Sequence, residues 1–112
     1  AAAGLISLEQ MPGRLGEDHA NARFLATELA KLDGVQLNPA HVETNIVIFG
    51  IAETGIQTSA FSERLKERGV LMNSVNARQM RAVTHYDVTR EDCATAVGAA
   101  AEVISEALAA RR

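Results

Sequence analysis

The run Thr44-Asn45-Ile46-Val47-Ile48-Phe49 constrains the fold of this chain more than any other segment. β-Branched and aromatic residues fill it, and such residues favour a strand over a helix. Its last four residues are continuously apolar, which is typical of a strand that is covered on both faces. We therefore expect residues 44–49 to form the central strand of a sheet, with Ile46 and Ile48 as well buried as Val47.

Two helices are predicted in the first two thirds of the chain. Apolar residues recur at steps of three, four or seven between Leu8 and Leu32, as on one face of a long amphipathic helix. Pro12-Gly13 interrupts this pattern and predicts a kink or break. Thr58 is expected to cap a second helix that runs to Arg68. Gly34 and Gly69 suit the left-handed residues that end helices.

A third helix is predicted at the C-terminal end of the chain. Thr89-Arg90-Glu91-Asp92 resembles a capping box in which Asp replaces the usual Glu or Gln. Apolar residues follow at steps of three and four through Leu108. The helix should therefore begin at Thr89 or within two residues of it.

Short strands are also predicted at residues 35–37, 70–72 and 79–84. Together with residues 44–49, they give the order helix, strand, strand, helix, strand, strand, helix. This order predicts a single α+β domain over residues 1–112, a small, mainly antiparallel sheet of three or four strands with helices on one face. The residues expected in its core are Ile46, Val47, Ile48, Leu65, Val83, Val97 and Ile104.

Composition excludes several classes of function. The net charge of -3, from 14 acids and 11 bases without a basic stripe, argues against a nucleic acid or a membrane surface as partner. The apolar stretches look too short to span a bilayer. A single cysteine rules out an internal disulfide and favours a reducing, cytoplasmic location. The three histidines are too scattered for a zinc site. The start at Ala1, without methionine, suggests part of a longer protein.

Most polar residues have structural interpretations. Glu63, Lys66 and Glu67 lie on one short helix and are expected to form a solvated face. Cys93 falls in the first turn of the last helix, with no histidine near it in sequence, and is expected to be a packed thiol rather than a nucleophile. The sequence contains neither a phosphate-binding glycine motif nor a nucleophile elbow.

Arg81 is the main candidate for a functional residue. On a strand, Arg81, Val83 and His85 share one face, while residues 80, 82 and 84 share the other. An arginine between apolar neighbours needs an anion or access to water, because an unpaired buried charge is costly. A carboxylate of the same domain, Asp87 or Glu43, could supply that anion. The alternative is a substrate carboxylate, which matches the two-pronged guanidinium geometry.

The segment around Arg81 also resembles a known family. Arg-x-Val-Thr-His-x-Asp-Val at residues 81–88, followed by Thr89-Arg90-Glu91-Asp92, is similar to the C-terminal signature of low-specificity L-threonine aldolases. Residues 17–23, 44–47 and 65–70 resemble other segments of that family in the same order. The similarity covers about residues 5–103, and Pro12-Gly13 departs from the family's uninterrupted helix.

The resemblance implies the small C-terminal domain of a pyridoxal-phosphate enzyme with the aspartate-aminotransferase-like fold. In that family a large domain holds the cofactor on a lysine and a small domain closes over it. Neither Lys31 nor Lys66 matches that lysine. The resemblance therefore implies that this chain binds no cofactor and is inactive alone, with the large domain as its partner.

The parent enzyme is expected to be a homo-oligomer, a dimer or tetramer, that cleaves L-threonine or its allo isomer to glycine and acetaldehyde. The resemblance makes Arg81 the residue that binds the substrate carboxylate. His85 lies on the same strand face as a weaker candidate. Two alternatives remain open, the equivalent domain of a related enzyme such as a β-eliminating lyase and a free-standing ferredoxin-like binding module without catalytic activity.

Overall fold

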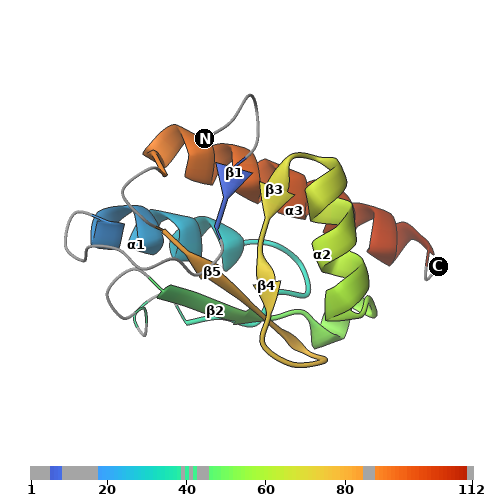
Figure 1. Cartoon of the computed structure of the whole chain (residues 1–112). Coiled ribbons are helices and arrows are strands. Elements are labelled where there is room, and N and C mark those ends of the chain that lie inside the picture. Colours follow the sequence, from blue (N-terminus) through green and yellow to red (C-terminus); the bar gives the residue numbers. More distant parts are fainter. Residues whose placement is uncertain are drawn as a thin grey trace.

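The structure is a computed structural model that describes residues 6–8, 18–38, 40, 42, 46–84 and 88–110. Figure 1 shows how its strands and helices are arranged. The strands are β1 (Ile6–Ser7), β2 (Ile46–Gly50), β3 (Val70–Leu71), β4 (Asn73–Ser74) and β5 (Gln79–Val83). The helices are α1 (Asp18–Leu29), α2 (Thr58–Glu67) and α3 (Arg90–Ala110), with a short 3-10 turn, η2 (Ala52–Thr54).

Strand β5 lies at the centre of the sheet. It pairs in antiparallel fashion with β2 on one side and with β4 on the other. β1 and β3 pair in parallel, and the N–H of Val83 in β5 donates to the carbonyl of Leu8 just after β1 at 2.8 Å. The predicted α+β fold with an antiparallel sheet is confirmed. The expectation that residues 44–49 form the central strand is wrong, because in the described part β2 has only the bridge between Gln36 and Gly50 on its other side.

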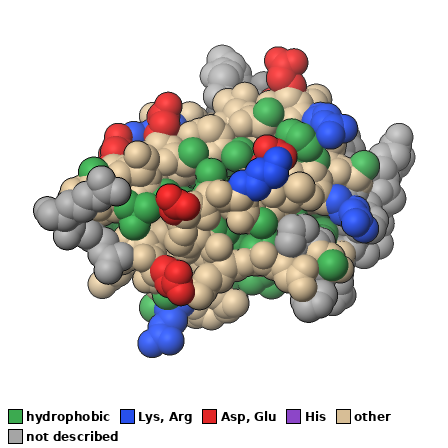
Figure 2. Space-filling view, turned by 180° about the vertical axis from the view of Figure 1, so that it is seen from behind, with side chains coloured by type: hydrophobic (Ala, Val, Ile, Leu, Met, Phe, Trp, Pro, Cys, Tyr) green, Lys and Arg blue, Asp and Glu red, His purple; other side chains and the backbone are tan. Residues whose placement is uncertain are grey.

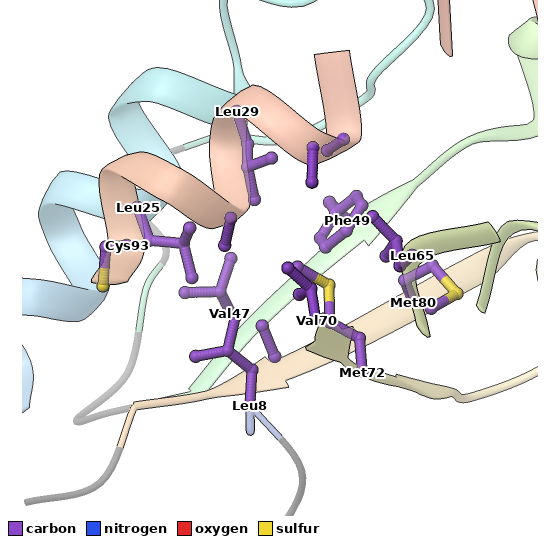
Figure 3. Close-up of a cluster of buried hydrophobic side chains, with 14 of the residues drawn as sticks. Leu8, Leu25, Leu29, Val47, Phe49, Leu65, Val70, Met72, Met80 and Cys93 are labelled. Atoms are coloured by element: carbon purple, nitrogen blue, oxygen red, sulfur yellow. The ribbon is translucent and has the colours of Figure 1, made fainter. Parts of the chain in front are cut away.

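The helices cover one face of the sheet, as the sequence predicts. Val47 and Phe49 of β2, together with Met80 and Ala82 of β5, are fully buried. Figure 3 shows Val47 and Phe49 directed from β2 toward the helices, where they join Leu25 of α1 and other apolar side chains in the core. The core therefore lies between the sheet and the helices.

Side chains on the other face of β2 remain partly exposed. Ile46 is 37% exposed and Ile48 is 45% exposed, whereas Val47 and Phe49 between and beyond them have no exposed surface. The prediction that Ile46 and Ile48 are buried in this chain is therefore wrong. Successive side chains of a strand point to opposite faces, so a continuously apolar run can belong to two different surfaces.

The remaining core predictions are largely confirmed. Leu65, Val83 and Ile104 are buried together with Val47. Val97 is only half-buried and packs at the margin of the core. Its position on α3 turns it partly away from the sheet.

The ends of the helices test three of the predictions. Thr89 and Asp92 form the reciprocal bonds of a capping box, with Thr89 N to Asp92 Oδ2 at 3.1 Å and Asp92 N to Thr89 Oγ1 at 3.0 Å, and α3 begins at Arg90. Gly34 and Gly69 have left-handed φ of 85° and 82°, as expected. Gly69 directly follows Arg68, the C-cap of α2, whereas α1 already ends at Leu29 and Gly34 belongs to the turn after it. The predicted cap at Thr58 is wrong, because the N-cap of α2 is Gln57.

The prediction of a first helix from Leu8 is wrong at its beginning. Leu8 directly follows β1, and its N–H donates to the carbonyl of Leu71 at 2.7 Å, so this segment is extended. The break expected at Pro12-Gly13 lies outside the described residues. The strand predicted at residues 35–37 is reduced to the bridge at Gln36, and the one predicted at residues 70–72 divides into β3 and β4 around Met72.

Helix α3 qualifies the expectation that no stretch could span a bilayer. It has 21 residues and a mean hydropathy of 1.4 in its most apolar window, so it is long and apolar enough by length and composition alone. Residues along one side of it, from Cys93 to Ala107, are buried in the core. A core helix of a soluble protein has the same length and composition.

Candidate functional site

Arg81 lies in the middle of β5 on the face that the helices do not cover. Its neighbours Met80 and Ala82 are fully buried on the helix side, whereas Arg81 itself is half-buried. The predicted alternation along this strand is therefore confirmed for residues 80–82, and Thr84 is buried as well. His85, the second candidate, lies outside the described residues.

The register of the sheet places one residue on each side of Arg81. Ile48 of β2 and Asn73 of β4 are its direct cross-strand partners. Residues directly opposite each other in an antiparallel pair point to the same face of the sheet. The side chains of Ile48, Arg81 and Asn73 therefore form a row across three strands.

Exposed apolar side chains lie in this row and beside it. Ile46, Ile48 and Val75 are the exposed large hydrophobic residues of the described part of the chain. Val75 follows Asn73 by two residues, and its N–H donates to the carbonyl of Gln79 at 2.9 Å, which keeps it in register with β5. We call the surface formed by Ile46, Ile48, Asn73, Val75 and Arg81 the open face.

The surroundings of Arg81 favour the binding of an anion. Its Nε atom is buried, so the guanidinium is partly shielded from water. A guanidinium that is partly desolvated among apolar side chains binds a carboxylate more strongly than it would in water. Glu43 and Asp87, the carboxylates proposed as internal partners, lie outside the described residues.

Neither lysine of the chain belongs to the open face. Lys31 lies just beyond α1, and its Nζ contacts Glu28 Oε2 at 2.9 Å on the surface. Lys66 is exposed on α2, one of the helices that cover the opposite side of the sheet. The described residues also contain no cluster of three or more His, Cys, Asp or Glu side chains that could hold a metal ion.

Cys93 is a packed thiol, as predicted. It is fully buried in the first turn of α3, and this burial, aided by the negative charge of Asp92, raises the pKa of its thiol to about 11. The thiol is therefore protonated and a poor nucleophile at neutral pH.

The charged residues of α2 also behave as expected. Glu63, Lys66 and Glu67 are exposed. Figure 2 shows acidic and basic side chains interspersed on the face seen there, without a basic stripe.

Sequence reasoning did not predict the charged link between α2 and α3. Arg68 at the end of α2 donates from Nε to Glu102 at 3.0 Å and from Nη2 to Glu106 at 2.7 Å. The hydrogen bond to Glu102 and the charge of Glu106 raise the pKa of Arg68. The spacing of the two glutamates, four residues apart on one helix, is the only signal in the sequence. These contacts lie on the surface and join two helices, so they form no site.

Comparison with known proteins identifies relatives along most of the chain. No family model matches it. It is 33% identical over 93 residues to low-specificity L-threonine aldolase 1 of Arabidopsis thaliana and 35% identical over 94 residues to low specificity L-threonine aldolase of Escherichia coli strain K12. These alignments cover 81% and 84% of the chain. The chain is a homologue of the low-specificity threonine aldolases.

The threonine aldolase homologues are much longer than this chain. It spans about a quarter of them, 26% in both alignments. Ornithine aminotransferases of Plasmodium yoelii and Plasmodium falciparum share its fold, each with a TM-score of 0.61 over 79% of the chain, at 14% and 12% identity. The chain covers 23% and 22% of those structures, so it has the fold of one part of a larger enzyme.

Proposed function

We propose that this chain is the C-terminal small domain of a pyridoxal-phosphate-dependent threonine aldolase, and that Arg81 binds the α-carboxylate of the substrate. The observation that carries the proposal is the position of Arg81 in the middle strand, on the sheet face opposite the helices and beside exposed apolar side chains, in a homologue of threonine aldolases. The parent enzyme would cleave L-threonine or L-allo-threonine to glycine and acetaldehyde in the cytoplasm, as a dimer or tetramer.

The residues of this chain do not fit the cofactor. A lysine that holds pyridoxal phosphate must face the substrate, whereas Lys31 and Lys66 are both at the surface, away from the open face. The cofactor site therefore belongs to the large domain, and the isolated chain is expected to be inactive. Mixing the chain with pyridoxal phosphate should give no absorbance band of lysine-bound cofactor. A stoichiometric band, trapped by borohydride on one lysine, would contradict this assignment.

The role of Arg81 is to fix the orientation of the substrate. Two parallel N–H donors of a guanidinium match the two oxygens of a carboxylate, which restricts how an amino acid can lie in the site. The apolar side chains of the open face exclude water when the large domain covers them, which strengthens this charge pair. Arg81 holds the carboxylate and takes part in no proton transfer. His85, on the same strand by sequence, is proposed as a neighbour of this site.

Replacing Arg81 in the full-length enzyme tests the proposal. Arg81→Ala should lower kcat/KM for threonine roughly thirtyfold to several-thousandfold, since losing one partner of a desolvated charge pair costs about 2–5 kcal/mol. Arg81→Lys should restore activity only in part, because lysine supplies the charge without the two-pronged geometry. The absorbance of the bound cofactor without substrate should remain unchanged.

Arg78→Ala is the matched control. Arg78 is exposed, lies three residues before Arg81 and contributes only its backbone to hydrogen bonds with the described residues. Its loss should leave kcat/KM nearly unchanged. An Arg81→Ala enzyme with a lower melting temperature and normal kcat/KM would show instead that Arg81 pairs with an internal carboxylate. Assays with tyrosine and tryptophan separate the aldolase from a β-eliminating lyase of the same fold.

A further inference from the structure

Asn73 has a special position relative to Arg81. It is the first of the two residues of β4 and lies directly opposite Arg81 in the antiparallel pair. Its side chain therefore projects from the same face of the sheet, with the two Cβ atoms roughly 5 Å apart. Asn73 is half-buried, so it is partly shielded from water.

The two neighbours of Arg81 differ in chemistry. The N–H of Ile51 donates to the carbonyl of Arg78 at 2.9 Å, so these two residues form a hydrogen-bonded pair of the ladder. Hydrogen-bonded and non-hydrogen-bonded pairs alternate along an antiparallel ladder. Ile48 and Arg81, three pairs further along, therefore form a non-hydrogen-bonded pair. Side chains approach most closely in such pairs, and Ile48 thus presents an apolar wall to Arg81. Asn73, on the other side, presents an amide with two donors and one acceptor.

The amide of Asn73 is available for a ligand. It makes no hydrogen bond with the part of the chain that the structure describes. Gln79, two residues before Arg81 on β5, already accepts a hydrogen bond from Asn76 Nδ2 at 2.9 Å through its Oε1 atom. The amide of Asn73 is half-buried and has no hydrogen-bond partner among the described residues. It would therefore be stabilised by an anion that binds to the neighbouring guanidinium.

We infer that Asn73 is a second substrate-binding residue, whose side-chain N–H donates to the same carboxylate that Arg81 binds. This inference rests on the proposed function and adds a residue to its site. Arg81 supplies charge and two parallel donors, and Asn73 supplies a neutral donor from the adjacent strand. The pair would hold the carboxylate between β4 and β5, with Ile48 closing the side toward β2.

The test compares ligands with and without a carboxylate on the full-length enzyme. Glycine and ethanolamine both carry the amine that reacts with the cofactor, but only glycine carries a carboxylate. The change in cofactor absorbance on titration gives the dissociation constant of each. Asn73→Ala should weaken glycine binding about tenfold to a hundredfold, as expected for a hydrogen bond to a charged group, and leave ethanolamine binding unchanged. Asn73→Asp should weaken glycine binding further, because its carboxylate repels the ligand and competes for Arg81.

Ser74→Ala is the matched control, since Ser74 is the other residue of β4, is exposed and points to the opposite side of the strand. It should bind both ligands normally. If Arg81→Ala weakens glycine binding and Asn73→Ala does not, the inference about Asn73 is overturned while the role of Arg81 stands. If Arg81→Ala itself has no effect on glycine binding, the proposed function fails as well. An equal loss for both ligands in Asn73→Ala, or a lower melting temperature, would assign Asn73 a structural role and also overturn the inference.

Discussion

The open face offers the sharpest test of how this chain fits into a larger enzyme. The perturbation is the double substitution Ile46→Thr and Ile48→Thr, which keeps β-branched side chains on β2 and removes apolar surface from the open face. If the large domain covers this face, the double variant should weaken the full-length enzyme and leave the isolated chain nearly unaffected.

The expected magnitude follows from the exposed fractions. Complete burial of an isoleucine side chain is worth about 1.5–3 kcal/mol. Because 37% of Ile46 and 45% of Ile48 are still exposed in this chain, covering the remainder contributes about 1 kcal/mol for each residue. The double variant should therefore lose about 2 kcal/mol of the free energy with which the large domain docks on the open face. This corresponds to roughly a thirtyfold change in the docking equilibrium constant.

Two preparations and one control make the assay decisive. Urea unfolding of the isolated chain should show a change within about 0.5 kcal/mol, as for other surface substitutions. The full-length variant should lose kcat/KM for threonine by roughly the thirtyfold factor worked out above. Val47→Thr, on the same strand but fully buried toward the helices, buries a hydroxyl in the core and should destabilise both preparations by about 1–3 kcal/mol.

Either of two results would rule out docking through the open face. Loss of stability in the isolated double variant as large as that of Val47→Thr would mean that Ile46 and Ile48 support this chain's own fold. Normal kcat/KM and normal stability in the full-length double variant would mean that the open face stays in water.

Two glycines should respond in opposite ways to substitution by alanine, as measured by thermal melts. Gly98→Ala in α3, where an added Cβ has no atom within 4 Å, should stabilise the isolated chain by about 0.5–1 kcal/mol. Gly34 has φ +85°, and an added Cβ would lie 2.7 Å from Thr54 Cγ2, so Gly34→Ala should destabilise the chain by about 1–3 kcal/mol. Alkaline pH should lower stability between the ordinary thiol pKa of 9.0 and the raised pKa of Cys93, about 11, because there the unfolded chain releases a proton that the folded chain keeps. Urea unfolding should show a slope of up to about 1.4 kcal/mol per pH unit from this thiol, which Cys93→Ala removes; equal slopes would contradict the assignment.

Local signals in the sequence predicted the features that depend on neighbouring residues. The capping box of Thr89 and Asp92 and the left-handed Gly34 and Gly69 each rest on interactions within a few residues. Alternation along β5 correctly separated Arg81 from the core. These features follow from local backbone geometry and do not depend on contacts with distant residues.

Features that depend on distant parts of the chain were harder to predict. The apolar run of β2 gave no sign of which residues would face the helices, because alternation is invisible where every residue is apolar. Asn73 lies between the strands predicted at residues 70–72 and 79–84, and only the antiparallel register with β5 shows that it is beside Arg81.

The pairing of β1 also determines where a shortened version of this domain can begin. β1 joins β3, which lies about sixty residues later, and Leu8 behind it is fully buried while its carbonyl accepts the N–H of Val83 at the end of β5. A shortened protein beginning at α1 would lose this buried leucine and leave the N–H of Val83 without its acceptor, next to the strand that carries Arg81. An excised or transplanted version of this domain must therefore start before Ile6, although the first long helix begins only at Asp18.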